Sequence, residues 1–216
     1  MSGYSNVSIG RFRRSPGGAR RPETGIASDA LVTLACATRA ELRAARRTGA
    51  RAALVGLGVS RGVPEGPLVS YGLAGALRDD LPVGTVLDAT RVVDADGTEL
   101  WSGRGLGVSA PATILAGDRI VDDPEERQRL HERTGADAID LESGALARTG
   151  RLRGVLRAVS DTPARPLDGL VGAVTPGGEA SWAGLVRAFV RSPRSFVRSA
   201  SDARRALGRL ERSWAA

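Results

Sequence analysis

Two carboxylates that could share a site follow two apolar stretches of the chain. Glu142 comes directly after AIDL and Asp161 directly after VLRAVS, and both stretches have the composition of buried strands. Ligands of α/β sheets bind beyond the carboxyl ends of strands, so the two acids are candidates for one site. There a carboxyl group can donate a proton, and a carboxylate can stabilise developing positive charge. Structural alternatives exist for both: Glu142 suits the first turn of a helix over 142–149, and Asp161 suits a turn at the following Thr-Pro.

A third acid, Glu41, follows another predicted strand. A glycine-rich segment at 72–75 stands at the end of a further one. Thr38-Arg39-Ala40-Glu41 is an S/T-x-x-E capping box, which by itself explains the glutamate. Since both features stand at the ends of strands, they are further candidates for the site of the two acids.

The elements that would position these residues alternate between strands and helices. Helices are predicted over 39–50 and 122–135, the second with an Asp cap, Pro124 in its first turn and Gly135 as its stop. The alternation predicts the α/β class: a single domain with a mixed, mainly parallel, twisted sheet flanked by helices. Further strands are predicted over 31–37, 52–58, 67–75 and 111–118, and a hairpin over 83–101 with its turn near Asp96–Gly97.

The composition excludes several kinds of chemistry. Cys36 is the single cysteine and His131 the single histidine, so neither an internal disulfide, a zinc site nor a Cys–His dyad is expected. All 31 basic residues are arginine, which excludes Walker-type phosphate binding and Schiff-base chemistry. GLGVSRG at 56–62 lacks the dinucleotide-binding spacing. We therefore expect no metal and no cofactor, and a reducing cytoplasm as the location.

The net charge of +7 belongs to the two ends of the chain. Residues 1–28 carry +4 and residues 183–216 carry +6, which leaves −3 for 29–182. An acidic middle with only 4% aromatic residues is not a nucleic-acid platform. Residues 1–27, rich in Gly, Ser, Pro and Arg, are predicted to be a disordered basic tail, and residues 28–216 one domain.

Two amphipathic helices are predicted on either side of Pro193. One hypothesis is that they close over the core. The other is that the basic surface of 183–216 rests on anionic lipid or a lipidic substrate, where each arginine contributes about 1 kcal/mol. The apolar positions are Trp182, Leu185, Val186, Phe189 and Val190 in the first helix, and Phe196, Ala200, Ala203, Leu207, Leu210 and Trp214 in the second.

Five segments of the chain, read together, resemble a known superfamily. They are TLACATRAELRAA, LVSYGLAGALRDDLPVGTV, ILAGDRIV, AIDLESGALA and LRAVSDT, between about residues 31 and 162. Their order and spacing are similar to those of the purine nucleoside phosphorylase and methylthioadenosine/adenosylhomocysteine nucleosidase superfamily. With its compact size and basic C-terminal helices, the chain looks most like the hopanoid-associated phosphorylases. Those are proposed to remove adenine from adenosylhopane, a lipid-linked nucleoside.

The resemblance implies a role for each candidate residue. Asp161 aligns with the family's SD motif, whose acid protonates the purine at N7, and Ser160 would hold its carboxyl group. Apolar surroundings should raise the pKa of Asp161 so that it carries the proton. Glu142 matches the glutamate that binds the ribose hydroxyls. The resemblance further implies that Gly72, Leu73, Ala74 and Gly75 lie close to base and sugar, and that Leu141, Ile120 and Val121 form pocket walls.

The attacking nucleophile is left open by the same comparison. Glu41 matches the glutamate with which nucleosidases activate water. A phosphorylase uses inorganic phosphate as co-substrate and needs cations, whereas here Leu73 stands where relatives often have a hydroxyl. Arg39 and Arg61 are the available substitutes. Hydrolysis and phosphorolysis are therefore both hypotheses.

The expected function is cleavage of the N-glycosidic bond of an adenine nucleoside. The first candidate substrate is adenosylhopane, and a soluble methylthioadenosine/adenosylhomocysteine-type nucleoside is the second. A hypothesis of another class is a non-catalytic, membrane-apposed nucleoside-binding protein. The resemblance also implies a homodimer. The single cysteine and the basic surface of 183–216 suggest a cytoplasmic protein in peripheral contact with the inner face of the membrane, and the charge distribution suggests no nucleic-acid partner.

Overall fold

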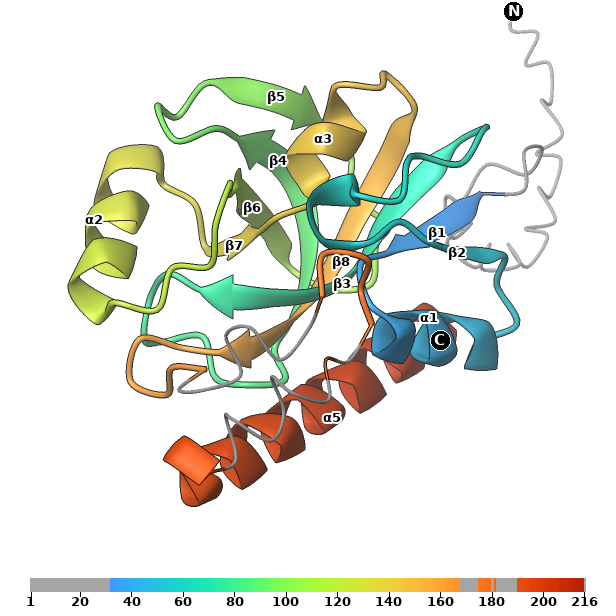
Figure 1. The fold of residues 1–216 in the computed structure, drawn as a ribbon. Coiled ribbons are helices and arrows are strands. Elements are labelled where there is room, and N and C mark those ends of the chain that lie inside the picture. The colour runs from blue at the N-terminus through green and yellow to red at the C-terminus, as the bar shows by residue number, and fades with distance from the viewer. Residues whose placement is uncertain (1–31, 168–174, 180, 182–189, 216) are drawn as a thin grey trace, which may run out of the picture.

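A mixed eight-stranded sheet forms the centre of the protein (Figure 1). The computed structural model describes residues 32–167, 175–179, 181 and 190–215. Its strands are β1 (Thr33–Cys36), β2 (Ala52–Leu54), β3 (Leu68–Ala76), β4 (Val86–Val93), β5 (Glu99–Ser102), β6 (Pro111–Ala116), β7 (Ala138–Asp140) and β8 (Leu152–Asp161). Its helices are α1 (Arg39–Arg47), α2 (Pro124–Thr134), α3 (Ser143–Ala147) and α5 (Pro193–Ala215), with a 3-10 turn at Leu57–Val59.

The sheet closes into a ring, which an open twisted sheet would not do. Strands β3, β7, β6 and β4 pair in that order, and β8 pairs with both β3 and β4. Parallel pairs predominate: β1–β2, β1–β3, β3–β8, β4–β6 and β6–β7 are parallel, and β3–β7, β4–β5 and β4–β8 are antiparallel. The predicted α/β domain with a mixed, mainly parallel sheet is confirmed, and its closure is the feature that the prediction lacked.

Local signals in the sequence set most element boundaries. Thr38 and Glu41 form the predicted capping box at α1. Asp123 caps α2, and Gly135 ends it at a φ of 66°, in the left-handed region that favours glycine. Strands β4 and β5 form the predicted antiparallel hairpin. These elements were predictable because each depends on residues close in sequence.

The strand predicted over 52–58 is shorter in the structure. It ends at Leu54, and the chain then turns through Gly56 and Gly58, which have φ values of 76° and 56°. Backbone in that region cannot continue a strand. The second half of the predicted strand is therefore a loop, and it lies beside the site described below.

Helix α5 packs along the outside of β8, β3 and β4 (Figure 1). Ala206 and Leu210 are fully buried against the strands, and Trp214 meets Tyr71 edge-on with 6.3 Å between ring centroids. The predicted apolar stripe of this helix is wrong at Ala200, which is exposed. Of the first predicted C-terminal helix only Val190 is described, and its side chain is exposed, contrary to the predicted apolar stripe. The rest of that helix and the 1–27 tail lie outside the described residues. Within the described part of the chain, no helix has the length and hydropathy needed to cross a membrane.

Candidate functional site

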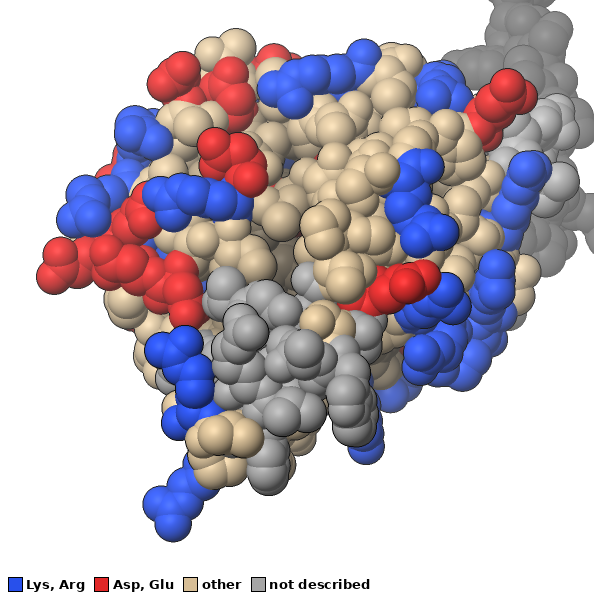
Figure 2. All heavy atoms as spheres, viewed as in Figure 1, with Lys and Arg blue, Asp and Glu red and all other residues tan. Residues whose placement is uncertain are grey.

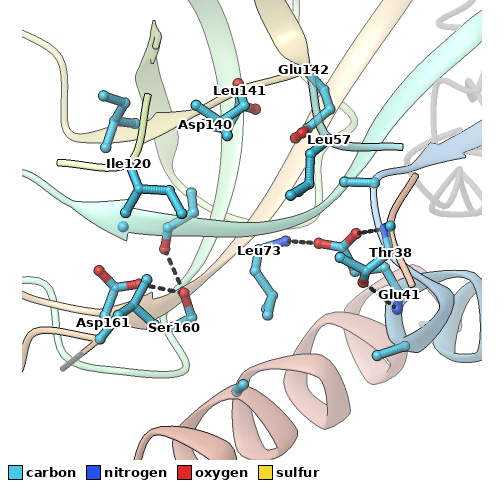
Figure 3. A pocket seen from close by; sticks show the side chains of 18 of the residues that line it. Thr38, Glu41, Leu57, Leu73, Ile120, Asp140, Leu141, Glu142, Ser160 and Asp161 are labelled. Carbon is cyan, nitrogen blue, oxygen red and sulfur yellow. Dashed lines mark hydrogen bonds between the residues drawn. The ribbon is translucent and has the colours of Figure 1, made fainter. Parts of the chain in front are cut away.

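A cavity of about 790 Å³ lies over the carboxyl end of β3 (Figure 3). Its volume is in the range of cavities that enclose a small molecule. All the residues predicted for the site line it except Gly72: Glu41, Leu73, Ala74, Gly75, Ile120, Val121, Leu141, Glu142, Ser160 and Asp161. The predicted residues thus come from five separate segments of the sequence, and the fold places them around one cavity.

Gly72 lies beneath the cavity, where it permits close packing. A Cβ atom there would stand 2.4 Å from Glu41 Oε1 and 2.6 Å from Arg157 Nη1. Both distances are far below van der Waals contact, so a larger residue would displace the glutamate or the guanidinium. Its part in the site is to leave room for Glu41 and Arg157.

The strand before Glu142 and the strand that carries Asp161 both pair with β3. Strand β7 runs antiparallel to β3, and β8 runs parallel to it. In the β3–β8 register Arg157 lies opposite Gly72, and Asp161 lies opposite Gly75. Three residues of strand span about 10 Å. The backbone of Arg157, whose side chain pairs with Glu142, therefore stands about 10 Å along β3 from the backbone of Asp161.

A shift in register sets the direction of the Asp161 side chain. Ala74 pairs with Val159, but Gly75 pairs with Asp161, so Ser160 is an extra residue on β8. Such irregularities re-aim side chains near functional sites. Here Ser160 and Asp161 both reach the cavity, and the Ser160 hydroxyl donates to Asp161 Oδ1 at 2.6 Å (Figure 3). This confirms the predicted contact between them.

Glu142 belongs to a buried cluster in which carboxylates outnumber guanidinium groups. Arg157 is fully buried, and its Nη2 lies 3.3 Å from Glu142 Oε2 while its Nε lies 2.6 Å from Asp140 Oδ2. The backbone N–H of Gly58 donates to Glu142 Oε1 at 3.1 Å. Glu142 stands at the N-terminus of α3, as its structural alternative requires, and makes no side-chain capping bond there.

Burial raises the pKa of Glu142 from 4.5 to about 8. Arg157 opposes the rise in this pKa, and the nearby charges of Asp140 and Glu41 add to it. The cluster therefore favours a proton on Glu142 near neutral pH.

Asp161 is buried against a second guanidinium, that of Arg127 on α2. The side chains of Asp161 and Arg127 are 4% and 1% exposed, and Arg127 Nη2 pairs with Asp161 Oδ2. Burial raises the pKa of Asp161 above its usual value, although Arg127 and Ser160 act in the opposite direction. The expected upward shift is thus present, with a counteracting ion pair.

Glu41 serves as both a cap and a lining group. Its Oε2 accepts from Thr38 N and its Oε1 accepts from Leu73 N, each at 2.8 Å. The carboxylate is 3% exposed and borders the cavity next to β3. The capping role and the site role suggested by the sequence are therefore compatible.

The proposed cationic substitutes for a phosphate site are occupied at the surface. Arg39 and Arg61 both reach Glu179, at 2.6 Å and 3.6 Å. Three further arginines, Arg43, Arg119 and Arg127, line the cavity together with the acids. Leu73 offers a dianion no hydroxyl.

Sequence reasoning missed Arg127 and Arg157, although each gives a signal. Arg157 interrupts the apolar stretch VLRAVS, where a solvent-exposed charge would be out of place. Arg127 lies one turn before Leu130 on the inner face of α2, and both are buried. Among the residues that the structure describes, no group of three or more His, Cys, Asp or Glu is arranged to hold a metal ion.

Comparison of the sequence with protein-family models and with curated proteins gives no match. Among solved structures, the 5′-methylthioadenosine/S-adenosylhomocysteine nucleosidase of Helicobacter pylori has a TM-score of 0.55 at 16% identity, over 85% of this chain and 97% of its own. Futalosine hydrolase of H. pylori has a TM-score of 0.52 at 16% identity, over 82% and 97%. The Campylobacter jejuni 5′-methylthioadenosine/S-adenosylhomocysteine nucleosidase has 0.50 at 16% identity, over 85% and 100%. The chain has the nucleosidase fold.

The raised pKa of Glu142 predicts how stability depends on pH. Between 4.5 and about 8 the folded protein holds a proton on Glu142 that the unfolded chain has lost. The stability that this carboxyl group contributes is therefore complete below its pKa in the unfolded chain. It is lost as pH rises through its pKa in the folded protein. Thermal unfolding at pH 5 to 9 should show a smaller loss in Glu142→Gln than in the wild type. Glu65→Gln, at an exposed glutamate, is the matched control, and an equal loss in Glu142→Gln would contradict the assignment.

Proposed function

We propose that the protein cleaves the N-glycosidic bond of a purine nucleoside, releasing adenine. The observation that carries the proposal is the placement of Asp161 and Glu142 in the lining of one cavity. One acid can then meet the base while the other meets the sugar. The likeness in fold to nucleosidases supports the same reaction class.

The chemistry assigns a proton donor and a sugar-binding group. Protonated Asp161 gives its proton to the purine ring nitrogen as the C–N bond breaks, and the bonding electron pair leaves with the base. The base departs neutral, and Asp161 becomes a carboxylate. Glu142 binds the ribose hydroxyls, and its charge, once formed, favours the positive charge that develops on the sugar. A proton donor in this position contributes about 10²–10⁴ in rate.

Water is the nucleophile that this site favours over phosphate. Glu41 lies on the cavity beside Leu73 and is held by two backbone N–H groups. It can take a proton from a water molecule whose oxygen adds to the anomeric carbon. Leu73 offers inorganic phosphate no hydroxyl, and the Arg39 guanidinium is already paired with Glu179. The products would then be adenine and a free sugar.

The substrate we favour carries a long apolar group on its sugar, as adenosylhopane does. Beyond the acids, the cavity is walled by Leu57, Leu73, Leu167, Ala203 and Leu207, the last two from α5. This wall suits an apolar substituent, and it also accommodates the small thioether of a methylthioadenosine-type nucleoside. The lipid-linked nucleoside is our first candidate and the soluble one our second.

The outer face of α5 favours contact with an anionic membrane. Both acids of this helix are already paired, Asp202 with Arg165 and Glu211 with Arg47, each at 2.8 Å. Arg194, Arg204, Arg205, Arg209 and Arg212 are exposed on α5, together with Val197. Figure 2 shows basic side chains gathered where α1 and the end of α5 lie in Figure 1. The same face also fits the rival function, a membrane-apposed nucleoside-binding protein without turnover.

Adenosine and 5′-methylthioadenosine, each incubated with and without phosphate, test the reaction. We expect adenine and a free sugar at rates independent of phosphate. Asp161→Asn should lower kcat by about 10²–10⁴ because the proton donor is lost. Glu41→Gln should lower kcat as well, whereas Asp96→Asn, at an exposed acid in the β4–β5 turn, should not.

Three outcomes would overturn parts of this proposal. No adenine from either nucleoside or from a lipid-linked one would leave the binding protein as the better hypothesis. Full activity in Asp161→Asn would remove the acid role. A sugar 1-phosphate product would show that phosphate, and not water, is the nucleophile.

Charge reversal on α5 tests the membrane contact separately. Wild-type protein should sediment with phosphatidylglycerol vesicles and not with phosphatidylcholine vesicles. The combined variant Arg204→Glu, Arg209→Glu and Arg212→Glu should lose this binding, since each arginine contributes about 1 kcal/mol. It should still cleave a soluble nucleoside. Reversal of Arg129 and Arg133 on α2 is the control, and loss of binding there would contradict a surface confined to α5.

A further inference from the structure

Arg127 is a buried cation whose partners all lie at one end of the cavity. Its Nε donates to the carbonyl of Val121 at 2.9 Å, and its Nη1 donates to the carbonyl of Ala76 at 3.0 Å. Its Nη2 donates to Asp161 Oδ2. The guanidinium is thus fixed on three sides by the wall of the cavity, the end of β3 and the candidate proton donor.

The stability of the fold does not by itself account for this group. Removing a guanidinium and a carboxylate from water is costly, and well-packed apolar residues often serve as well or better in a core. Because this buried ion pair includes the proposed acid of the reaction, we expect Arg127 to have a role in that reaction. Asp122, 3.8 Å from Arg127 Nη2, is the other carboxylate near the pair and is one-third exposed.

The two oxygens of Asp161 have different partners. Oδ2 accepts from Arg127, and Oδ1 lies 2.6 Å from the Ser160 hydroxyl. A guanidinium has no lone pair with which to accept, so a proton on Oδ2 would displace the Arg127 bond. When Asp161 is protonated, the proton therefore belongs on Oδ1, the oxygen beside Ser160.

We propose that Arg127 is a positioning residue for Asp161: it binds Oδ2 throughout the reaction, keeps the transferable proton on Oδ1, and stabilises the carboxylate that remains after the base takes the proton. This inference rests on the proposed function. In the transfer, the Oδ1–H bond breaks and an N–H bond forms on the purine. The resulting negative charge is shared with a guanidinium already in contact with it, so no reorganisation is needed.

The glycine at the end of β3 fits this arrangement. A Cβ atom on Gly75 would lie 2.8 Å from Asp161 Oδ2 and 3.4 Å from Arg127 Nη2. The absence of a side chain therefore leaves space for the ion pair against the strand. Gly75 serves the pair in the way that Gly72 serves Glu41 and Arg157.

Substitution of Arg127 with a comparison of two leaving groups tests the inference. Adenine needs protonation to depart, whereas the 4-nitrophenolate of a 4-nitrophenyl riboside does not. Arg127→Gln should lower kcat for adenosine by about 10²-fold with little change in KM. Turnover of the nitrophenyl riboside should stay within a few-fold of wild type. Arg129→Gln, two residues along on the exposed side of α2, is the matched control and should leave both rates unchanged.

The pH profile supplies a second readout. It decides between the outcomes in case the wild type does not accept the nitrophenyl riboside. The charged groups about Asp161 are Arg127 and, beyond it, Asp122. Arg127 lowers the pKa of Asp161, and the protonated form is active. The alkaline limb of kcat/KM for adenosine should therefore move to higher pH in Arg127→Gln. Arg127→Lys keeps a charge near Oδ2 and should return the limb toward its wild-type position.

The outcomes separate this inference from the proposed function. A wild type that releases no adenine contradicts the function itself. An active wild type whose Arg127→Gln variant keeps its kcat and its alkaline limb overturns the role of Arg127 alone. Equal losses on both leaving groups, with an unmoved limb, would show that Arg127 acts only on the fold. If Arg127→Gln does not fold, the limb and kcat of Arg127→Lys decide between the same outcomes.

Discussion

The pairing of β8 with β3 is the interaction on which the rest of the structure depends. It closes the ring of strands, and its register lays Arg157 beside Gly72 and Asp161 beside Gly75. The shift at Ser160 then turns the last acid into the cavity. One backbone ladder thus closes the ring and sets the positions of Arg157 and Asp161 along β3.

The site contains two buried groups of charges, which differ in the ratio of carboxylates to guanidinium groups. Asp161 pairs with Arg127, which also lies 3.8 Å from the partly exposed Asp122, whereas Glu142 shares Arg157 with Asp140 and lies near Glu41. The pairs give two different environments: a carboxyl group whose charge is compensated as soon as it forms, and a cluster with more acids than cations. Different protonation behaviour in neighbouring carboxyl groups is how one site can supply a proton donor and a charge-stabilising group. Their burial costs stability, which the large apolar core offsets.

The sequence predicted what depends on local chemistry and on the ordered motifs. Thr38 and Glu41, the Asp123 cap and the β4–β5 hairpin follow from residues near one another, and the five motifs located the cavity lining. Ring closure was not predictable, because it depends on β8 pairing with strands far away in sequence. The role of Arg127 was not predictable for the same reason. An arginine in PEERQRLHERT is an ordinary solvated residue until α2 packs against the end of β3.

The account's central claim is that one nucleoside spans the cavity with its base at Asp161 and its sugar at Glu142. A crystal structure with an adenine C-nucleoside, whose carbon–carbon bond cannot be cleaved, tests it most directly. We expect a ring nitrogen of the base about 2.6–3.2 Å from Asp161 Oδ1 and the ribose hydroxyls hydrogen-bonded to Glu142. We also expect Arg127 to remain paired with Asp161 Oδ2. A ligand bound in the reverse direction, or outside the cavity over β3, would contradict it.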